Sequence, residues 1–230
     1  MSGSRASLSI RGIGRKLWQR HRWSLPLSVA STIFFVRLGF EMREGELDAF
    51  DSSMQHVVDG FRGPWDQVML FLTSAGEIGP MTLLTVVVLI ALVLRKRPRE
   101  ARFLAVSSLG SLLLNILLKA LFHRARPAAA LGYLISVPTS LSFPSGHTMG
   151  ATGVVGSLII VVRALGAPRP IFALAAVLGS AFVAGVALSR VYLGAHFPSD
   201  VLGGFLAESA WLSAITGWAY PRLLPGEQTP

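Results

Sequence analysis

Three short segments of the chain combine basic, imidazole and carboxylate side chains that could together bind an anion and attack it. In sequence order they read Lys119-x6-Arg126-Pro127, then Pro144-Ser145-Gly146-His147, then Ser189-Arg190-x5-His196-x3-Asp200. Long apolar runs separate them. Because charge at membrane depth is energetically costly, such residues are functional candidates by default.

The third segment contains a candidate nucleophile. His196 and Asp200 are four residues apart and would share a face if both were helical. Pro198 between them suits the first turn of a helix. Asp200 could then accept a hydrogen bond from one imidazole nitrogen and leave the other free to attack. Taken alone, an acid in a first helical turn and an interfacial histidine would explain the same residues.

The second segment contains a candidate acid beside an oxyanion site. Gly146 lets the backbone approach an anion closely, and a helix that starts here offers free N–H groups. Ser145 adds a hydroxyl donor, and His147 would protonate a leaving alkoxide. The alternative is an ordinary Pro-Ser-Gly turn with a serine cap before a helix.

The remaining cations, Lys119, Arg126 and Arg190, have the side chains that bind phosphate oxygens. Each alone could instead extend from a helix end to the membrane interface. The whole set suits phosphoryl transfer, in which cations neutralise the phosphate while one histidine attacks and the other protonates the leaving group. With no carboxylate cluster to hold Mg²⁺, the set favours a route through a phosphohistidine without metal or other cofactor.

The composition indicates that the solvent is lipid. The 230 residues are 52% hydrophobic and 14% charged, whereas soluble domains carry about 25% charged residues. The net charge of +9 would suggest nucleic acid in a soluble protein, but the basic residues lie beside apolar runs and indicate membrane topology instead. We expect one integral membrane domain and no nucleic-acid partner. The chain has no cysteine, which excludes disulfide and thiolate chemistry.

The apolar runs predict an all-α bundle of six transmembrane helices. The expected spans are residues 24–40, 79–94, 102–122, 147–163, 170–189 and 199–219. A shorter apolar piece at 65–76 ends at Gly76, Gly79 and Pro80, so we expect a re-entrant or interfacial helix there. Segment 45–62 reads as an amphipathic helix on the outer surface.

Basic residues predict the orientation. Fourteen of the 21 lysines and arginines fall in the N-terminal tail, in the loops after the second and fourth spans, and in the C-terminal tail, which the positive-inside rule makes cytoplasmic. The loop after the first span is acidic and belongs outside. The first span contains Arg37 and lacks a clear cleavage site, so we expect a retained span. We predict a cytoplasmic tail at 1–22, a membrane domain at 23–220, a cytoplasmic tail at 221–230, and all three motifs on the extracytoplasmic face of the cell (inner) membrane.

The three motifs, in this order and with this spacing, resemble the type-2 phosphatidic acid phosphatase / vanadium haloperoxidase superfamily. The motifs cover residues 119–200 and the span pattern extends the resemblance over most of the chain. The resemblance implies that His196 is the nucleophile, Asp200 its orienting partner and His147 the acid. It implies that phosphate is bound by Lys119, Arg126, Ser145, Gly146 and Arg190.

Size and span number resemble the bacterial membrane members, which implies a lipid phosphate substrate: phosphatidylglycerol phosphate, undecaprenyl pyrophosphate or phosphatidic acid. The alternatives are a lipid phosphotransferase with the same site and an anion-binding transporter. His123 and Arg124 are extra to the pattern and are interpreted as lining the entrance. Thr73, Ser74 and Glu77, at the break before the second span, could shape the entrance, and the alternative that we favour is an ordinary loop. Arg37 could extend to the interface or pair with a lipid phosphate, and Asn115 and Glu208 could form hydrogen bonds between helices. None of the three receives a catalytic role.

Overall fold

The computed structural model describes residues 23–127 and 141–223, and every regular element in these two stretches is a helix. The helices are α2 (Ser24–Arg43), α3 (Asp48–Asp59), α4 (Asp66–Ala75), α5 (Ile78–Leu94), α6 (Pro98–Phe122), α7 (Gly146–Ala164), α8 (Arg169–Tyr192) and α9 (Pro198–Leu223). The all-α prediction is confirmed. The predicted tail at 1–22 and most of the tail at 221–230 lie outside the described residues.

Local sequence signals explain several of the helix boundaries. Pro98 and Pro198 open α6 and α9, where a missing N–H costs nothing because the first turn has no intrahelical acceptor for it. The hydroxyl of Ser145 accepts a hydrogen bond from the backbone N–H of Thr148 and caps α7. Helix α6 ends at His123, whose left-handed backbone (φ 50°) turns the chain out of the helix.

A break separates α4 from α5, as the glycines and proline predict. Glu77 adopts an extended conformation, and the two helices are bent by 48° relative to each other. The bent pair is long and apolar enough to be one broken span or a re-entrant loop. The apolar piece at 65–76 is therefore a helix of its own, α4.

Four helices in the described residues, α2, α6, α7 and α8, are each long and apolar enough to cross a membrane, and the α4–α5 pair is a fifth candidate. A helix occupies the sixth predicted position as α9, but α9 does not meet the same criterion of length and apolarity. Its middle contains Gly203, Gly204 and Glu208, which lower its hydropathy. Sequence and structure thus agree on a helical membrane protein. The described residues contain four to five strongly apolar candidates for the six predicted spans.

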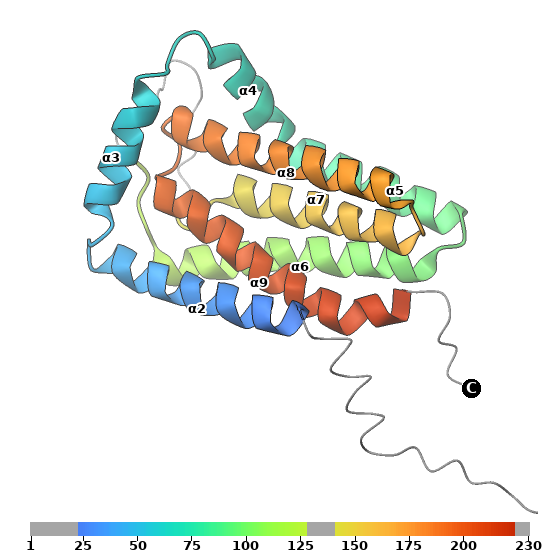
Figure 1. Ribbon diagram of the computed structural model, residues 1–230. Coiled ribbons are helices and arrows are strands. Elements are labelled where there is room, and N and C mark those ends of the chain that lie inside the picture. The colour runs from blue at the N-terminus through green and yellow to red at the C-terminus, as the bar shows by residue number, and fades with distance from the viewer. Residues whose placement is uncertain (1–22, 128–140, 224–230) are drawn as a thin grey trace, which may run out of the picture.

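The long helices run side by side, and α3 lies across one end of the bundle (Figure 1). We call this end, where the α2–α3 and α8–α9 connections meet, the site end. Helix α7 is central, since half of its apolar window is buried against 6% for α8, and it packs against α6, α8 and α9. Apolar side chains such as Leu83, Leu117 and Val177 face outward, as lipid contact requires. The expected helix within 45–62 is confirmed as α3, and its place on the outer membrane surface stays a prediction.

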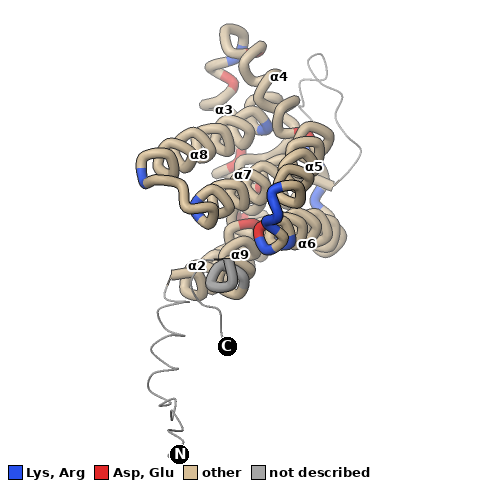
Figure 2. The backbone as a smooth tube through the Cα atoms, turned by 90° about the vertical axis from the view of Figure 1, so that its right-hand side faces the viewer, with Lys and Arg blue, Asp and Glu red and all other residues tan. Residues whose placement is uncertain are grey.

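Lysines and arginines gather at the other end of the bundle. Figure 2 shows them at the α5–α6 and α7–α8 connections. The residues are Arg95, Lys96, Arg97, Arg99, Arg102, Arg163 and Arg169. The molecule therefore has one basic end and one site end.

Three polar residues of the helices that received no catalytic role have partners within the protein. Glu208 of α9 accepts a hydrogen bond from Ser111 of α6 at 2.6 Å, and Asn115 of α6 donates to the sulfur of Met149 in α7 at 3.1 Å. Both bonds connect helices, as predicted. Arg37 pairs with Glu41 one turn along α2 at 2.6 Å.

Candidate active site

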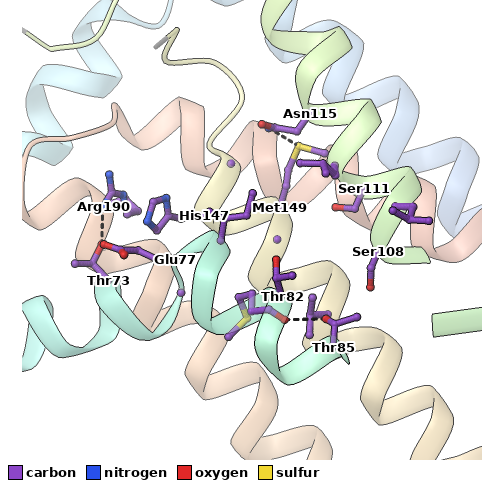
Figure 3. A pocket seen from close by; sticks show the side chains of 18 of the residues that line it. Thr73, Glu77, Thr82, Thr85, Ser108, Ser111, Asn115, His147, Met149 and Arg190 are labelled. Atoms are coloured by element: carbon purple, nitrogen blue, oxygen red, sulfur yellow. Dashed lines mark hydrogen bonds between the residues drawn. The ribbon is translucent and has the colours of Figure 1, made fainter. Parts of the chain in front are cut away.

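The three motifs meet at a single cavity of about 800 Å³ at the site end. It lies among α4, α5, α6, α7 and α8, which contribute the residues shown in Figure 3. Six of the eight predicted site residues line it: Lys119, Arg126, Gly146, His147, Arg190 and His196. The other two, Ser145 and Asp200, are fully buried next to these residues. The structure thus brings together all eight positions, while the roles inferred for them stay predictions.

His196 lies in the short loop between α8 and α9, and the loop folds back on the end of α8. The backbone N–H groups of Ala195 and His196 both donate to the carbonyl of Arg190, at 3.0 and 3.2 Å. This local turn brings the Arg190 and His196 positions together. Helix α9 starts at Pro198 as predicted, so His196 precedes the helix and does not share a helical face with Asp200. The carboxylate instead reaches back over the first turn, where it also accepts the N–H of Phe197 at 2.9 Å.

The two nitrogens of His196 have different partners. Nδ1 lies 3.3 Å from Oδ2 of Asp200, and Nε2 lies 3.1 Å from Nη1 of Arg126. Because a guanidinium can only donate, Nε2 must be the acceptor and the proton belongs on Nδ1. Burial lowers the pKa of His196 to about 4, although the Asp200 carboxylate acts in the opposite direction. At neutral pH the imidazole is therefore neutral, with a lone pair on Nε2.

Lys119, Arg126 and Arg190 approach the cavity from three segments. Arg190, at the end of α8, is 3% exposed and donates through Nη1 to the hydroxyl of Thr73 in α4. Its Nε is buried without a hydrogen-bond partner. Lys119, near the end of α6, donates to the carbonyl of Leu141. An anion in the cavity would find an unused donor on Arg190, beside two further cations that the fold has already positioned.

The N-terminus of α7 forms another wall of the cavity. Gly146 and His147 line it, and Nε2 of His147 is buried without a hydrogen-bond partner. The Ser145 hydroxyl accepts from the N–H and the hydroxyl of Thr148, so its observed role is the helix cap that the sequence left open as the alternative. The N-terminus of a helix carries free N–H groups and a partial positive charge, which favour a bound anion.

Close packing of α9 holds this wall against Asp200. The backbone N–H of Ser145 donates to the carbonyl of Asp200 at 3.0 Å. A side chain at Gly204 would place its Cβ 2.8 Å from the carbonyl oxygen of Ser145, which is closer than real Cβ atoms come. Only glycine therefore permits this approach between the two motifs.

Four residues beside the site were not among the site residues predicted from sequence: Arg124, Asp51, Thr73 and Ser142. Arg124 was interpreted as an entrance residue, which is wrong, because its side chain is 11% exposed and pairs with Asp51 and Asp200. Thr73, read as part of an ordinary loop, is buried in α4 and holds Arg190. Ser142 donates its hydroxyl to Asp200. Spacing gives no signal for these residues, since each partner lies far away in sequence.

The part of the chain that the structure describes has no group of three or more histidine, cysteine, aspartate or glutamate side chains placed to hold a metal ion. The charged groups around the cavity are mainly cations. The arrangement is one that binds an anion directly.

Comparison with known proteins identifies the class to which this helical fold and cavity belong. Residues 100–223 match the PAP2 superfamily, a stretch that covers more than half of the chain, and the chain belongs to that superfamily. It is also similar to a solved structure, the crystal structure of a transmembrane PAP2-type phosphatidylglycerolphosphate phosphatase from Bacillus subtilis. The TM-score is 0.75 at 26% identity, over 85% of this chain and 96% of the other.

Several characterised proteins are similar in sequence. Decaprenylphosphoryl-5-phosphoribose phosphatase of Mycobacterium tuberculosis is 35% identical over 122 residues, which are 51% of this chain and 62% of that protein, so the match spans less than two thirds of this relative. Phosphatidylglycerophosphatase B of Bacillus subtilis is 28% identical over 77% of this chain and 87% of its own length. Undecaprenyl-diphosphatase of Sulfolobus acidocaldarius is 30% identical over 65% and 68%. The expected superfamily is confirmed.

Proposed function

We propose that this protein is an integral membrane lipid phosphatase that hydrolyses a phosphomonoester or diphosphate through a phosphohistidine on His196. The observation that carries the proposal is that two histidines, in different hydrogen-bonding states, line the same cavity as three cations. Phosphatase relatives of similar sequence support it. No metal or other cofactor is required by this route.

In the first step Nε2 of His196 attacks phosphorus while the bond from phosphorus to the leaving oxygen breaks. Arg126 would transfer its hydrogen bond from Nε2 to a phosphate oxygen, and Lys119 and Arg190 would balance the remaining charge. His147, which binds a proton when the anionic substrate enters the cavity, gives that proton to the leaving oxygen. The products are the lipid alcohol, or the lipid monophosphate from a diphosphate, and the phosphohistidine.

In the second step water replaces the leaving group. His147, now neutral, takes a proton from the water as its oxygen bonds to phosphorus and the bond from phosphorus to Nε2 breaks. Inorganic phosphate leaves, and both histidines return to their starting states. Asp200 orients the imidazole and stabilises the positive charge that it carries during the first step.

The proposed topology has six spans, with the α4–α5 pair as one broken span and α9 as the last. The basic end of the bundle supports a cytoplasmic location for the α5–α6 and α7–α8 connections and for both termini. The cavity would then open on the extracytoplasmic face of the cell membrane. Charged groups at helix ends, rather than at the midplane, favour an enzyme over a transporter.

The substrate would be a lipid whose phosphate reaches the site end while its chains remain in the bilayer. Apolar residues of α5 and α6, among them Met81, Leu89 and Leu112, line the cavity beyond the charged groups. They suit an acyl or prenyl chain. Phosphatidylglycerol phosphate, undecaprenyl pyrophosphate, phosphatidic acid and a decaprenyl-linked sugar phosphate are the candidates to compare.

The test is phosphate release from these lipids in detergent or vesicles, with a chelator present. We expect release by the wild-type protein and a loss of about 10³-fold or more in His196→Ala, the scale seen when a catalytic nucleophile is removed. His56→Ala, which truncates an exposed histidine on α3, is the matched control and should keep full activity.

Full activity of His196→Ala would overturn the nucleophile assignment, and an absolute need for Mg²⁺ would overturn the metal-free route. Transfer of phosphate to an added lipid alcohol in preference to water would identify a phosphotransferase instead.

A further inference from the structure

Arg124 connects two buried carboxylates, one of which belongs to the proposed catalytic pair. Its Nη1 donates to Oδ1 of Asp200 at 2.8 Å, and its Nη2 donates to Oδ2 of Asp51 at 2.7 Å. The guanidinium also lies 4.1 Å above the centre of the Phe197 ring. A planar, rigid fork can hold two acceptors at once in this manner, which a lysine cannot.

Asp51 attaches the surface helix α3 to the start of α9. Its Oδ1 accepts the backbone N–H of Ser199 at 2.8 Å, and its Oδ2 accepts the Ser199 hydroxyl at 2.6 Å. The side chain is 2% exposed. Asp51 therefore caps, from 148 residues away, the helix turn that carries Asp200.

The Asp200 carboxylate is held by donors on both oxygens. Oδ1 accepts from Arg124, and Oδ2 accepts from Ser142 and from the backbone N–H of Phe197. With Oδ1 fixed by Arg124, Oδ2 is directed toward Nδ1 of His196. Loss of Arg124 would remove the donor that fixes Oδ1 and would leave two buried acids, Asp51 and Asp200, without their shared counter-charge.

We infer that Arg124 and Asp51 are positioning residues for the catalytic pair, which fix the Asp200 carboxylate and set how strongly its charge acts on His196. This inference rests on the proposed function of His196 and Asp200. Neither residue lines the cavity, so both act through Asp200 and not on phosphate. Helix α3, outside the three motifs, thereby becomes part of the active site.

The inference predicts opposite electrostatic effects for the two residues. The charged or titratable groups that surround His196 are Asp200, Arg124, Asp51, Arg126, Arg190, Lys119 and His147. Replacing Arg124 by glutamine removes a positive charge, which raises the pKa of His196. Replacing Asp51 by asparagine removes a negative charge, which lowers the pKa of His196.

The experiment measures kcat and KM for phosphate release over a range of pH in wild type, Arg124→Gln, Arg124→Lys and Asp51→Asn. In Arg124→Gln we expect kcat to fall about 10–100-fold, the scale for groups that orient a functional histidine from behind, with KM nearly unchanged. On the acid side of the pH profile kcat/KM falls as His196 becomes protonated, and we call this part of the curve the acid limb. The acid limb should move to higher pH in Arg124→Gln and to lower pH in Asp51→Asn. Arg124→Lys keeps the charge and should keep the wild-type limb while losing part of kcat.

A purely structural role would lower the rate equally at every pH. Unmoved acid limbs in both Arg124→Gln and Asp51→Asn would therefore overturn the inference, as would wild-type kcat in Arg124→Gln. If Arg124→Gln does not yield a monodisperse protein in detergent, the position of the limb in Asp51→Asn decides. Inactive wild type, or active His196→Ala, would instead overturn the proposed function itself, so the two failures are distinguishable.

Discussion

The two histidines of the cavity lie in opposite kinds of surroundings. His196, in the α8–α9 loop, is 1% exposed and has a partner at each nitrogen. His147, at the start of α7, also faces the cavity, but its Nε2 has no partner. The side of the proposed nucleophile is held in place before the substrate arrives, whereas the side of the proposed acid awaits a group that the substrate brings. A nucleophile gains from fixed geometry, and a general acid needs a partner that exists only in the complex.

The contrast extends to the surrounding residues. Behind His196, hydrogen bonds connect α3, α9 and the segments after α6 and before α7. On the cavity side, α5 and α6 offer mainly apolar side chains. The first region should therefore control kcat, and the second should control which lipid binds.

Removing the proposed acid, His147, tests the contrast between the two histidines most clearly. In His147→Ala we expect lipid phosphate hydrolysis to fall about 10²–10⁴-fold, because an alkoxide leaves poorly without a proton. An aryl phosphate such as p-nitrophenyl phosphate has a better leaving group and should lose much less. The measurement compares both rates in the same preparation, and equal losses on the two substrates would contradict the role of His147.

The burial of His196 predicts a pH-dependent stability. Since its pKa falls from about 6.5 in the unfolded chain to about 4 in the fold, the unfolded state binds more protons between these values. Stability is then fully present above pH 6.5 and is lost as the pH falls to 4, by about 3 kcal/mol. Thermal unfolding in detergent should show this loss in wild type and a flatter profile in His196→Gln. If stability fell with pH by the same amount in wild type and in His196→Gln, this would contradict a buried, neutral imidazole at His196.

Substitutions of the cations that line the cavity should mainly change substrate binding, measured as KM. Arg190→Lys keeps the charge but loses the fork, so we expect KM to rise about 10-fold with a smaller change in kcat. Arg169→Lys, the same change at the exposed start of α8, is the matched control. Inhibition by vanadate should weaken in parallel with KM. A fall in kcat at constant KM would place Arg190 with the nucleophile region instead.

The helices were predictable because each depends on nearby residues. The expected span at 24–40 became Ser24–Arg43, and the break at Gly76 divides α4 from α5 as expected. The motif residues were predictable from spacing because each motif is local. The sequence could not show which of the many acids after the first span is buried, since the donors to Asp51 lie at Arg124 and Ser199. Local patterns likewise could not show that Arg124 points inward.

Long-range contacts also explain what the sequence did not show about α9. Its start at Pro198 was predictable, but its glycines serve close packing against the second motif, as at Gly204, and lower its apolar character. In α9, the helix that carries Asp200, the glycines that close packing requires therefore lower the hydropathy by which a membrane span is recognised in the sequence.

The most direct test of the account is to trap the phosphoenzyme. Protein incubated briefly with a phosphate-labelled lipid substrate and then denatured in alkali should retain label that acid removes, as a phosphoramidate bond would. We expect the label on the peptide that contains His196 in wild type and in His56→Ala, and none in His196→Ala. Label that persists in His196→Ala, or hydrolysis by wild type with no trapped label at any time, would contradict attack by His196.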